Sequence, residues 1–162
     1  MNLKNNNIKI ILILTICVVL IDQLSKFVIE KAIINETSSG FITISKAIND
    51  GLAIGFNEGN KKNIILMMFV LFIVIKFIVS QREQIDIKTS VALGMVLGGG
   101  IGNFIDRLFR GGVFDFIKVG KFFTGNVADI FVIIGWIMII IFVITRDSIK
   151  NKKNGEKTCE KE

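Results

Sequence analysis

The chain has 162 residues, of which 51% are hydrophobic, and its mean hydropathy is +0.62. Twenty lysines and arginines stand against fourteen acidic residues, giving a net charge of +6, and the chain contains no histidine. So much apolar sequence in a short chain favours several membrane spans over one soluble domain. Without histidine, a rhomboid-like serine protease lacks its usual base, and a zinc protease lacks a histidine-bearing ligand motif.

Four apolar segments are predicted to cross a membrane, at residues 8–29, 64–79, 90–108 and 127–144. The first measures roughly 33 Å as a helix, enough to cross a hydrocarbon layer of about 30 Å. We expect residues 1–145 to form a single four-span domain. Residues 146–162 are expected to form a flexible basic tail, whose lysines favour a cytoplasmic C-terminus and, with an even number of spans, a cytoplasmic N-terminus.

The two cysteines are not expected to pair, because Cys17 lies in the first span and Cys159 lies in the solvated tail. The sequence therefore predicts a fold without disulfides.

The ends of the first and third spans carry charged residues at helical spacing. Asp22 and Lys26 are four positions apart, so they share a helix face and can neutralise each other. Asn103 and Arg107 have the same spacing, with Asp106 between them. One interpretation is structural: charges paired near a helix end, with the lysine and arginine side chains extending outward to the membrane surface.

The segments that follow the first and third spans are predicted to lie on the membrane surface. Residues 30–63 contain the β-prone run Phe41–Ile44 and the turn-rich Asn49–Gly51, which favour a small strand or hairpin. Residues 109–126 contain Val113–Ile117, in which hydrophobic residues flank an aspartate. We expect this second segment to rest against lipid as a loop.

Glycines recur every four positions in the third span, at Gly94, Gly98 and Gly102. They remove side chains from one helix face, so a neighbouring backbone can approach closely. The stripe predicts tight helix packing and needs no further function.

Two aspartates, Asp115 and Asp129, stand at the edge of the predicted membrane region. Acidic residues at this depth are costly, so they are a functional hypothesis. If the carboxyl groups are close, they share a proton, and one can activate water while the other acts as an acid. Asn126 is a candidate N-cap that would place Asp129 at the third helical position, where the helix dipole favours the anion.

Other functions remain open at this point. The same aspartates could bind cations or relay protons in a small transporter, or simply cap helices. A non-enzymatic assembly factor that packs a partner helix against the glycine stripe is a further alternative.

Five blocks in order resemble the lipoprotein signal peptidases, also called type II signal peptidases, which are membrane aspartic proteases. They are DQLSK at Asp22–Lys26, NDGLAIG at Asn49–Gly55, GGGIGNFIDRL at Gly98–Leu108, VFDFI at Val113–Ile117 and NVAD at Asn126–Asp129.

This resemblance implies that Asp115 and Asp129 form a catalytic dyad, and that Asp106 does not belong to it. It also implies an endopeptidase that removes signal peptides from diacylglyceryl-modified bacterial prolipoproteins, cutting just before the lipidated cysteine. The residues that match substrate-binding or site-supporting positions are Asn49, Gly51, Asn103, Arg107, Asn126, Ala128, Asp22 and Lys26.

The implied fold is an all-α membrane protein, with four transmembrane helices, a small extracytoplasmic β-platform and a short surface helix. The active site would face the extracytoplasmic side of the bacterial cytoplasmic membrane. We expect a monomer without metal or cofactor, whose partners are prolipoprotein substrates and membrane lipid, and not nucleic acid.

Three departures from the family pattern concern the shape of the pocket. Leu52 and Ile54 stand where alanine and phenylalanine are usual, and Gly125 stands where phenylalanine is usual. Phe104, Phe114 and Phe116 are predicted either to wall the site or to face lipid.

Overall fold

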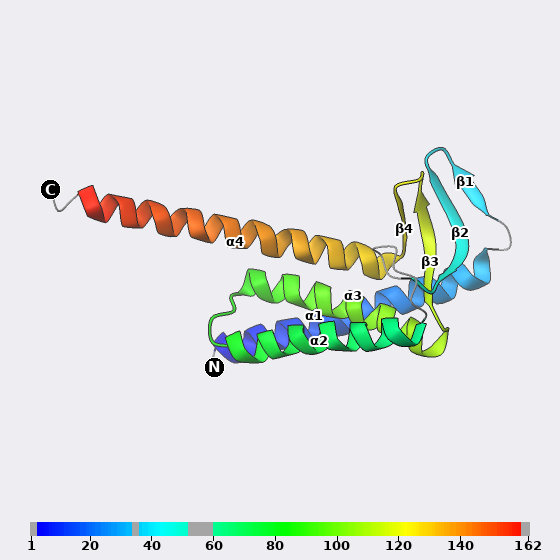
Figure 1. Cartoon of the computed structure of the whole chain (residues 1–162), viewed down its shortest axis with the longest axis horizontal. Helices are drawn as coiled ribbons and strands as arrows, with labels where there is room; N and C mark the ends of the chain where they lie inside the picture. Colours follow the sequence, from blue (N-terminus) through cyan, green and yellow to red (C-terminus); the bar gives the residue numbers. More distant parts are fainter. Residues whose placement is uncertain (1–2, 34–35, 52–59, 160–162) are drawn as a thin grey trace.

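The computed structural model describes residues 3–33, 36–51 and 60–159 (Figure 1), and it describes side chains for residues 6–33, 36–51 and 61–145. The elements in chain order are α1 (Leu3–Ala32), β1 (Thr37–Ser39), β2 (Ile42–Asn49), α2 (Asn60–Gln81), α3 (Ile87–Phe109), β3 (Val113–Val119), β4 (Phe123–Gly125) and α4 (Val127–Cys159).

Four helices are long and apolar enough to span a membrane, which confirms the predicted number. Their apolar parts are Asn6–Ala32, Lys61–Gln81, Ile87–Phe109 and Val127–Thr145. The sheet stands at one end of the helices, and both chain termini lie toward the opposite end (Figure 1). The predicted class, a helical membrane protein with a small sheet, is confirmed.

Two features of the prediction are not tested. No further helix occurs within the described ranges 3–33, 36–51 and 60–159, while residues 52–59, which include Leu52 and Ile54, lie outside them. Helix α4 continues to Cys159, past its apolar part. The surface helix and the flexibility of the tail stay predictions.

Helix α3 is the centre of the bundle. In its most apolar 18-residue stretch, 61% of the residues are buried, whereas 11% to 17% are buried in the corresponding stretches of the other three spans. Its N-terminus is capped by Asp86, whose side chain accepts a hydrogen bond from the Thr89 amide at 2.8 Å. Helices α1, α2 and α4 all pack against it.

The glycine stripe of α3 allows this packing, as predicted. A Cβ atom added to Gly94 would lie 2.8 Å from Leu14 Cβ, and one added to Gly98 would lie 2.6 Å from Val18 Cβ. Both neighbours belong to α1. A methyl group on this face would therefore separate the two helices.

We expect Gly98→Ala to destabilise the protein by about 1–3 kcal/mol, because the new Cβ would also lie 3.0 Å from the Thr15 carbonyl oxygen. Gly100→Ala is the matched control, since its Cβ would meet only the flexible end of Leu71 within 4 Å. Thermal unfolding in detergent measures the difference. Equal unfolding temperatures for the two variants would contradict close α1–α3 packing.

The sheet is antiparallel, with strand order β1-β2-β3-β4. The β-prone run at Phe41–Ile44 does form a strand, although β2 starts at Ile42 and continues to Asn49. A register shift between Ile44 and Ala47 brings Ala47 opposite Asp115, and Asn49 lies opposite Val113. The end of β2 therefore lies beside the aspartate.

The prediction that residues 109–126 lie as a loop against lipid is wrong. They contain β3, which pairs with β2 on one side and β4 on the other. Phe114 and Phe116 are buried and pack together with ring centroids 6.0 Å apart, so neither faces lipid. Pairing on both sides satisfies the backbone hydrogen bonds, which allows the strand to be enclosed.

Candidate active site

The start of α4 presents Asp129 through a reciprocal cap. Asn126 Oδ1 accepts a hydrogen bond from the Asp129 amide at 3.1 Å, and Asp129 Oδ2 accepts one from the Asn126 amide at 3.1 Å. This is the geometry of a capping box with the acid at the third helical position. The predicted N-cap is confirmed.

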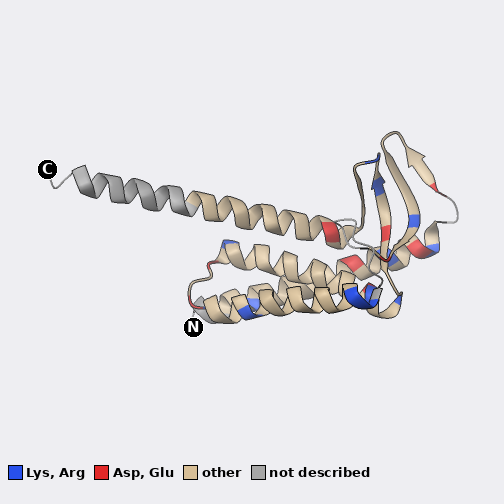
Figure 2. Cartoon of the chain, viewed as in Figure 1, with Lys and Arg blue, Asp and Glu red and all other residues tan. Residues whose placement is uncertain are grey.

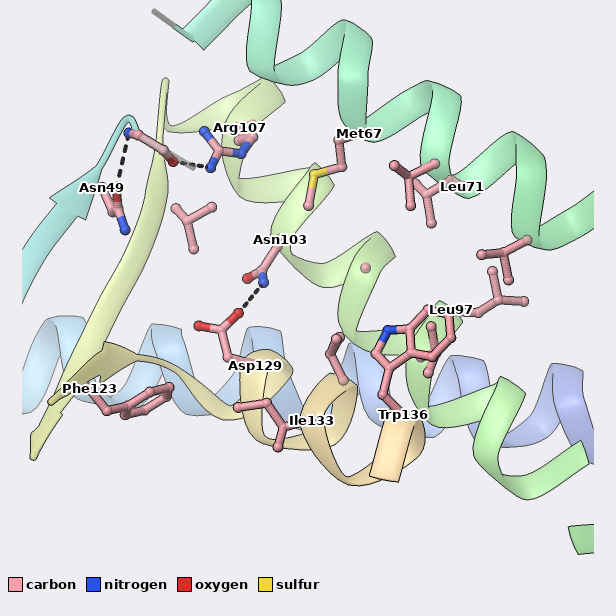
Figure 3. A pocket seen from close by; sticks show the side chains of 17 residues that line it. Asn49, Met67, Leu71, Leu97, Asn103, Arg107, Phe123, Asp129, Ile133 and Trp136 are labelled. Carbon is pink, nitrogen blue, oxygen red and sulfur yellow. Dashed lines mark hydrogen bonds between the residues drawn. The ribbon is translucent and has the colours of Figure 1, made fainter. Parts of the chain in front are cut away.

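Asn126 also connects the two aspartates. Its Nδ2 donates to Asp115 Oδ1 at 2.9 Å and to Asn103 Oδ1 at 3.0 Å. Asn103 Nδ2 in turn donates to Asp129 Oδ1 at 2.7 Å (Figure 3). The structure thus joins Asp115 on β3 and Asp129 on α4 through shared asparagine amides, and the two carboxylates interact electrostatically.

Asp115 lies in an enclosed environment with only 2% of its surface exposed. Burial raises the pKa of its carboxyl group, while hydrogen bonds from Asn49 and Asn126 oppose that rise. Asn49 Nδ2 donates to Asp115 Oδ2 at 2.9 Å. A carboxyl group with a raised pKa keeps its proton closer to neutral pH, as proton-sharing carboxylates do.

A buried charge cluster lies beside the aspartates. Lys26 Nζ contacts Asp22 Oδ2 at 2.8 Å and Asp106 Oδ2 at 2.7 Å, and all three side chains are 0% exposed. The same ammonium group donates to Asn103 Oδ1 at 3.2 Å. Figure 2 shows acidic and basic residues gathered toward the sheet end of the helices.

The cluster confirms the predicted pairing of Asp22 with Lys26, but the prediction that Lys26 and Arg107 extend outward is wrong. Both are buried. Two carboxylates and an amide oxygen compensate the buried ammonium, so it has no need to reach the membrane surface.

Asp22 and Asp106 extend the cluster to the backbone on either side. Asp22 Oδ1 accepts a hydrogen bond from the Ala128 amide at 3.0 Å, and Asp106 Oδ2 accepts one from the Phe114 amide at 3.0 Å. Asp106 thereby belongs to the supporting cluster. It holds the amide of Phe114, the residue that directly precedes Asp115 on β3. The cluster ties α1 and α3 to the starts of α4 and β3.

Arg107 reaches the turn after β2. Its Nη2 donates to the Gly51 carbonyl at 2.6 Å and its Nη1 to the Asp50 carbonyl at 3.4 Å. The Gly51 amide donates to Asn49 Oδ1 at 3.0 Å. The structure therefore brings all the residues selected from the sequence into one region.

A cavity of about 350 Å³ lies next to these groups, between α2, α3 and α4 (Figure 3). Its polar end is formed by Asn49, Asn103, Arg107 and Asp129. Asp115 is linked to this end through Asn49. The remaining side chains are apolar: Met67, Val70, Leu71, Val74, Val96, Leu97, Val113, Phe123, Val132, Ile133 and Trp136. The cavity is thus amphipathic, with carboxylate chemistry at one end.

Sequence reasoning did not select two amide side chains, the half-buried Gln23 and the buried Asn63. Gln23 Nε2 donates to Asp22 Oδ2 at 3.0 Å and to Asp106 Oδ1 at 3.2 Å. Asn63 on α2 donates to the Asp50 carbonyl at 2.6 Å. The sequence signal that could have identified them is an uncharged amide residue at the end of an apolar segment.

Gly125 allows close approach to Asp129. A Cβ atom at this position would lie 2.5 Å from Asp129 Oδ2 and 2.6 Å from the Phe123 ring. The Phe123 ring, which lines the cavity, thus occupies the space that the side chain of a larger residue at position 125 would need.

We expect Gly125→Ala to displace the Asp129 carboxylate and so to lower, by at least about tenfold, the rate of any reaction that depends on that carboxylate. Gly111→Ala, with nothing within 4 Å of its added Cβ, tests for a general effect of glycine replacement next to the sheet, although its φ of +79° makes the change strained. A Gly125→Ala variant with unchanged activity would contradict this account.

Taken together, fold and site define an integral membrane protein with amide-bridged aspartates beside an apolar cavity. Residues 14–145 match the family model described as signal peptidase (SPase) II. Lipoprotein signal peptidases from three strains of Dehalococcoides mccartyi are 36%, 36% and 37% identical, over 80% of this chain and 86%, 86% and 85% of theirs.

Two solved structures described as bacterial membrane enzymes are each 28% identical, with TM-scores of 0.74 and 0.69. They cover 86% and 82% of this chain, and 90% and 91% of their own. The chain belongs to the signal peptidase II family. It is a multi-pass membrane peptidase of lipoprotein processing, which confirms the family resemblance of its five sequence blocks.

Proposed function

We propose that this peptidase is an aspartic endopeptidase in which Asp115 and Asp129 activate water. Its substrate is a prolipoprotein bearing diacylglycerol on cysteine, and cleavage falls just before that cysteine. The observation that carries the proposal is the bridge through Asn126, which donates to Asp115 Oδ1 and, by its backbone amide, to Asp129 Oδ2.

The reaction needs one proton shared between the two carboxyl groups. The ionised member removes a proton from water, and the oxygen attacks the peptide carbonyl carbon. The protonated member donates a hydrogen bond to the carbonyl oxygen, which becomes the oxyanion of a tetrahedral intermediate. The C–N bond then breaks, and the amine leaves with the proton taken from water.

Burial raises the pKa of Asp115, which supports the presence of one shared proton on the pair near neutral pH. The pair titrates as a unit, so its pH profile reports apparent pKa values of the dyad.

The cavity supports a lipid-anchored substrate. Its walls from α2, α3 and α4 are apolar, and its polar end includes Asp129. Acyl chains or the apolar signal peptide occupy the walls while the scissile bond reaches the carboxylates. Asn49 and Gly51 contact substrate at this end, whereas the supporting residues are Asn103, Arg107, Asn126, Ala128, Asp22 and Lys26.

The protein works as a monomer in the bacterial cytoplasmic membrane, with both termini in the cytoplasm and the site on the extracytoplasmic side. The lysine-rich segment after the fourth span supports this orientation. The sheet lies at the end of the bundle opposite the termini (Figure 1).

The test uses purified wild-type protein in lipid with a prolipoprotein prepared with and without diacylglycerol on its cysteine. We expect cleavage of the modified form only, with a mature product whose first residue, by mass spectrometry, is the lipidated cysteine. Cleavage elsewhere, or none by a demonstrably folded protein, would overturn the proposal.

A further inference from the structure

Within residues 61–81, the part of α2 whose side chains are described, one buried polar side chain lies near the site. Asn63, in the first turn of the helix, is 1% exposed, and its Nδ2 donates to the Asp50 carbonyl at 2.6 Å. A buried amide is costly unless it is hydrogen-bonded, so this contact selects one backbone position for residue 50.

A second helix holds the same turn. Arg107 on α3 donates to the Gly51 carbonyl at 2.6 Å and to the Asp50 carbonyl at 3.4 Å. We call Asn63, Arg107 and the two carbonyl groups the 50–51 clamp. Because side chains from two helices hydrogen-bond to successive peptide units, the turn after β2 cannot rotate without breaking at least one of these hydrogen bonds.

The clamped turn sets the orientation of the Asn49 amide. The Gly51 amide donates to Asn49 Oδ1 at 3.0 Å, which forms an Asx turn. With its oxygen engaged by the backbone, the amide must present Nδ2 on its other side. That nitrogen donates to Asp115 Oδ2 at 2.9 Å.

We propose that Asn63 is a positioning residue for the reaction: through the 50–51 clamp, it keeps the Asn49 amide aimed at Asp115. This inference rests on the proposed function, since it concerns the assigned aspartate. Asn63 itself acts through Asn49 and touches neither carboxylate.

The hydrogen bond from Asn49 favours the ionised form of Asp115 and so lowers its pKa, against the larger effect of burial. If Asn49 swings away, the pKa of Asp115 rises further. The other charged groups that act on Asp115 or interact with it are Lys26 on α1, Asp106 and Arg107 on α3, and Asp129 on α4. Replacement of Asn63 removes none of these charges, so the expected direction of the change in the pKa of Asp115 is upward.

The test is Asn63→Leu, which removes the donor at similar volume. We expect kcat to fall about tenfold, with KM within about twofold, and the apparent pKa values of the dyad, read from the pH profile of kcat, to shift upward. Met68→Leu on the same helix, where the side chain is 54% exposed, is the matched control and should behave as wild type.

A double-mutant cycle separates positioning from general destabilisation. The double variant Asn49→Ala with Asn63→Leu should lose no more kcat than Asn49→Ala alone, because both changes remove the same hydrogen bond to Asp115. Additive losses, or a lower kcat with an unmoved pH profile, would overturn the proposal, as would a wild-type kcat for Asn63→Leu.

If Asn63→Leu does not fold, Asn63→Ser carries the same test, because its shorter side chain cannot span the present 2.6 Å contact. Failure of the proposed function is seen separately, as absence of prolipoprotein cleavage by wild-type protein or full activity after Asp115→Asn.

Discussion

Asp115→Asn and Asp129→Asn are each expected to reduce prolipoprotein cleavage at least about a thousandfold. Asparagine has nearly the same shape as aspartate, but it cannot take up or release the proton that the reaction moves. Membrane insertion should be unchanged. The unfolding temperature should fall only modestly, because one oxygen that accepts a hydrogen bond in each aspartate becomes an NH2 group that cannot accept it. The measurement is the rate of release of the lipidated product under single-turnover conditions, with circular dichroism and gel filtration to verify folding.

Asp86→Asn is the matched control for this prediction. Asp86 caps α3 from the α2–α3 connection, and asparagine caps a helix as well as aspartate does. It should retain wild-type activity. A fully active Asp115→Asn or Asp129→Asn enzyme would exclude the dyad mechanism. Asp106→Asn should instead affect folding more than chemistry, because Asp106 pairs with buried Lys26 at 2.7 Å.

Lys26→Met is expected to lower the free energy of unfolding by about 3–5 kcal/mol, the usual cost of breaking a buried ion pair from one side. The variant would leave the buried carboxylate of Asp22 without its cation, and that of Asp106 with the guanidinium of Arg110, whose Nε lies 3.4 Å from Asp106 Oδ1. Those carboxylates hold the Ala128 and Phe114 amides, so activity should fall as well. Unfolding in detergent, followed by thermal or denaturant titration, measures the loss.

Lys76→Met tests whether the effect belongs to the cluster. Lys76 also lies within a span, on α2, but its side chain is exposed. It should leave stability nearly unchanged. If Lys26→Met unfolds at the wild-type temperature, the buried cluster does not hold α4 and β3 in place.

Several features could be predicted because local chemistry decides them. Lipid requires about 20 apolar residues for each crossing helix, so the four spans followed from hydropathy. The glycines every four positions in α3 indicated close packing at any neighbouring helix. Asn126 three positions before Asp129 indicated a helix cap, and the cap exists because both partners lie in one helical turn.

Other features could not be predicted, because they depend on groups far apart in the chain. Lys26 was expected to reach outward, but Asp106, eighty residues later, compensates its charge. Residues 109–126 were expected to form a loop, but β2 supplies a pairing partner for β3. Asn63 could not be recognised, because its partner is the Asp50 backbone rather than a patterned side chain.

The sequence by itself determined the membrane class, the number of spans, the helix cap at Asp129 and, through five ordered blocks, the family. Those properties follow from hydropathy, from contacts within one turn and from residue identity. Tertiary structure alone decided that Asp115 and Asp129 meet through Asn126, and that a turn held from α2 and α3 aims Asn49 at Asp115. Each of these contacts joins separate elements, and only the packing of helices and sheet brings their polar atoms within hydrogen-bond distance.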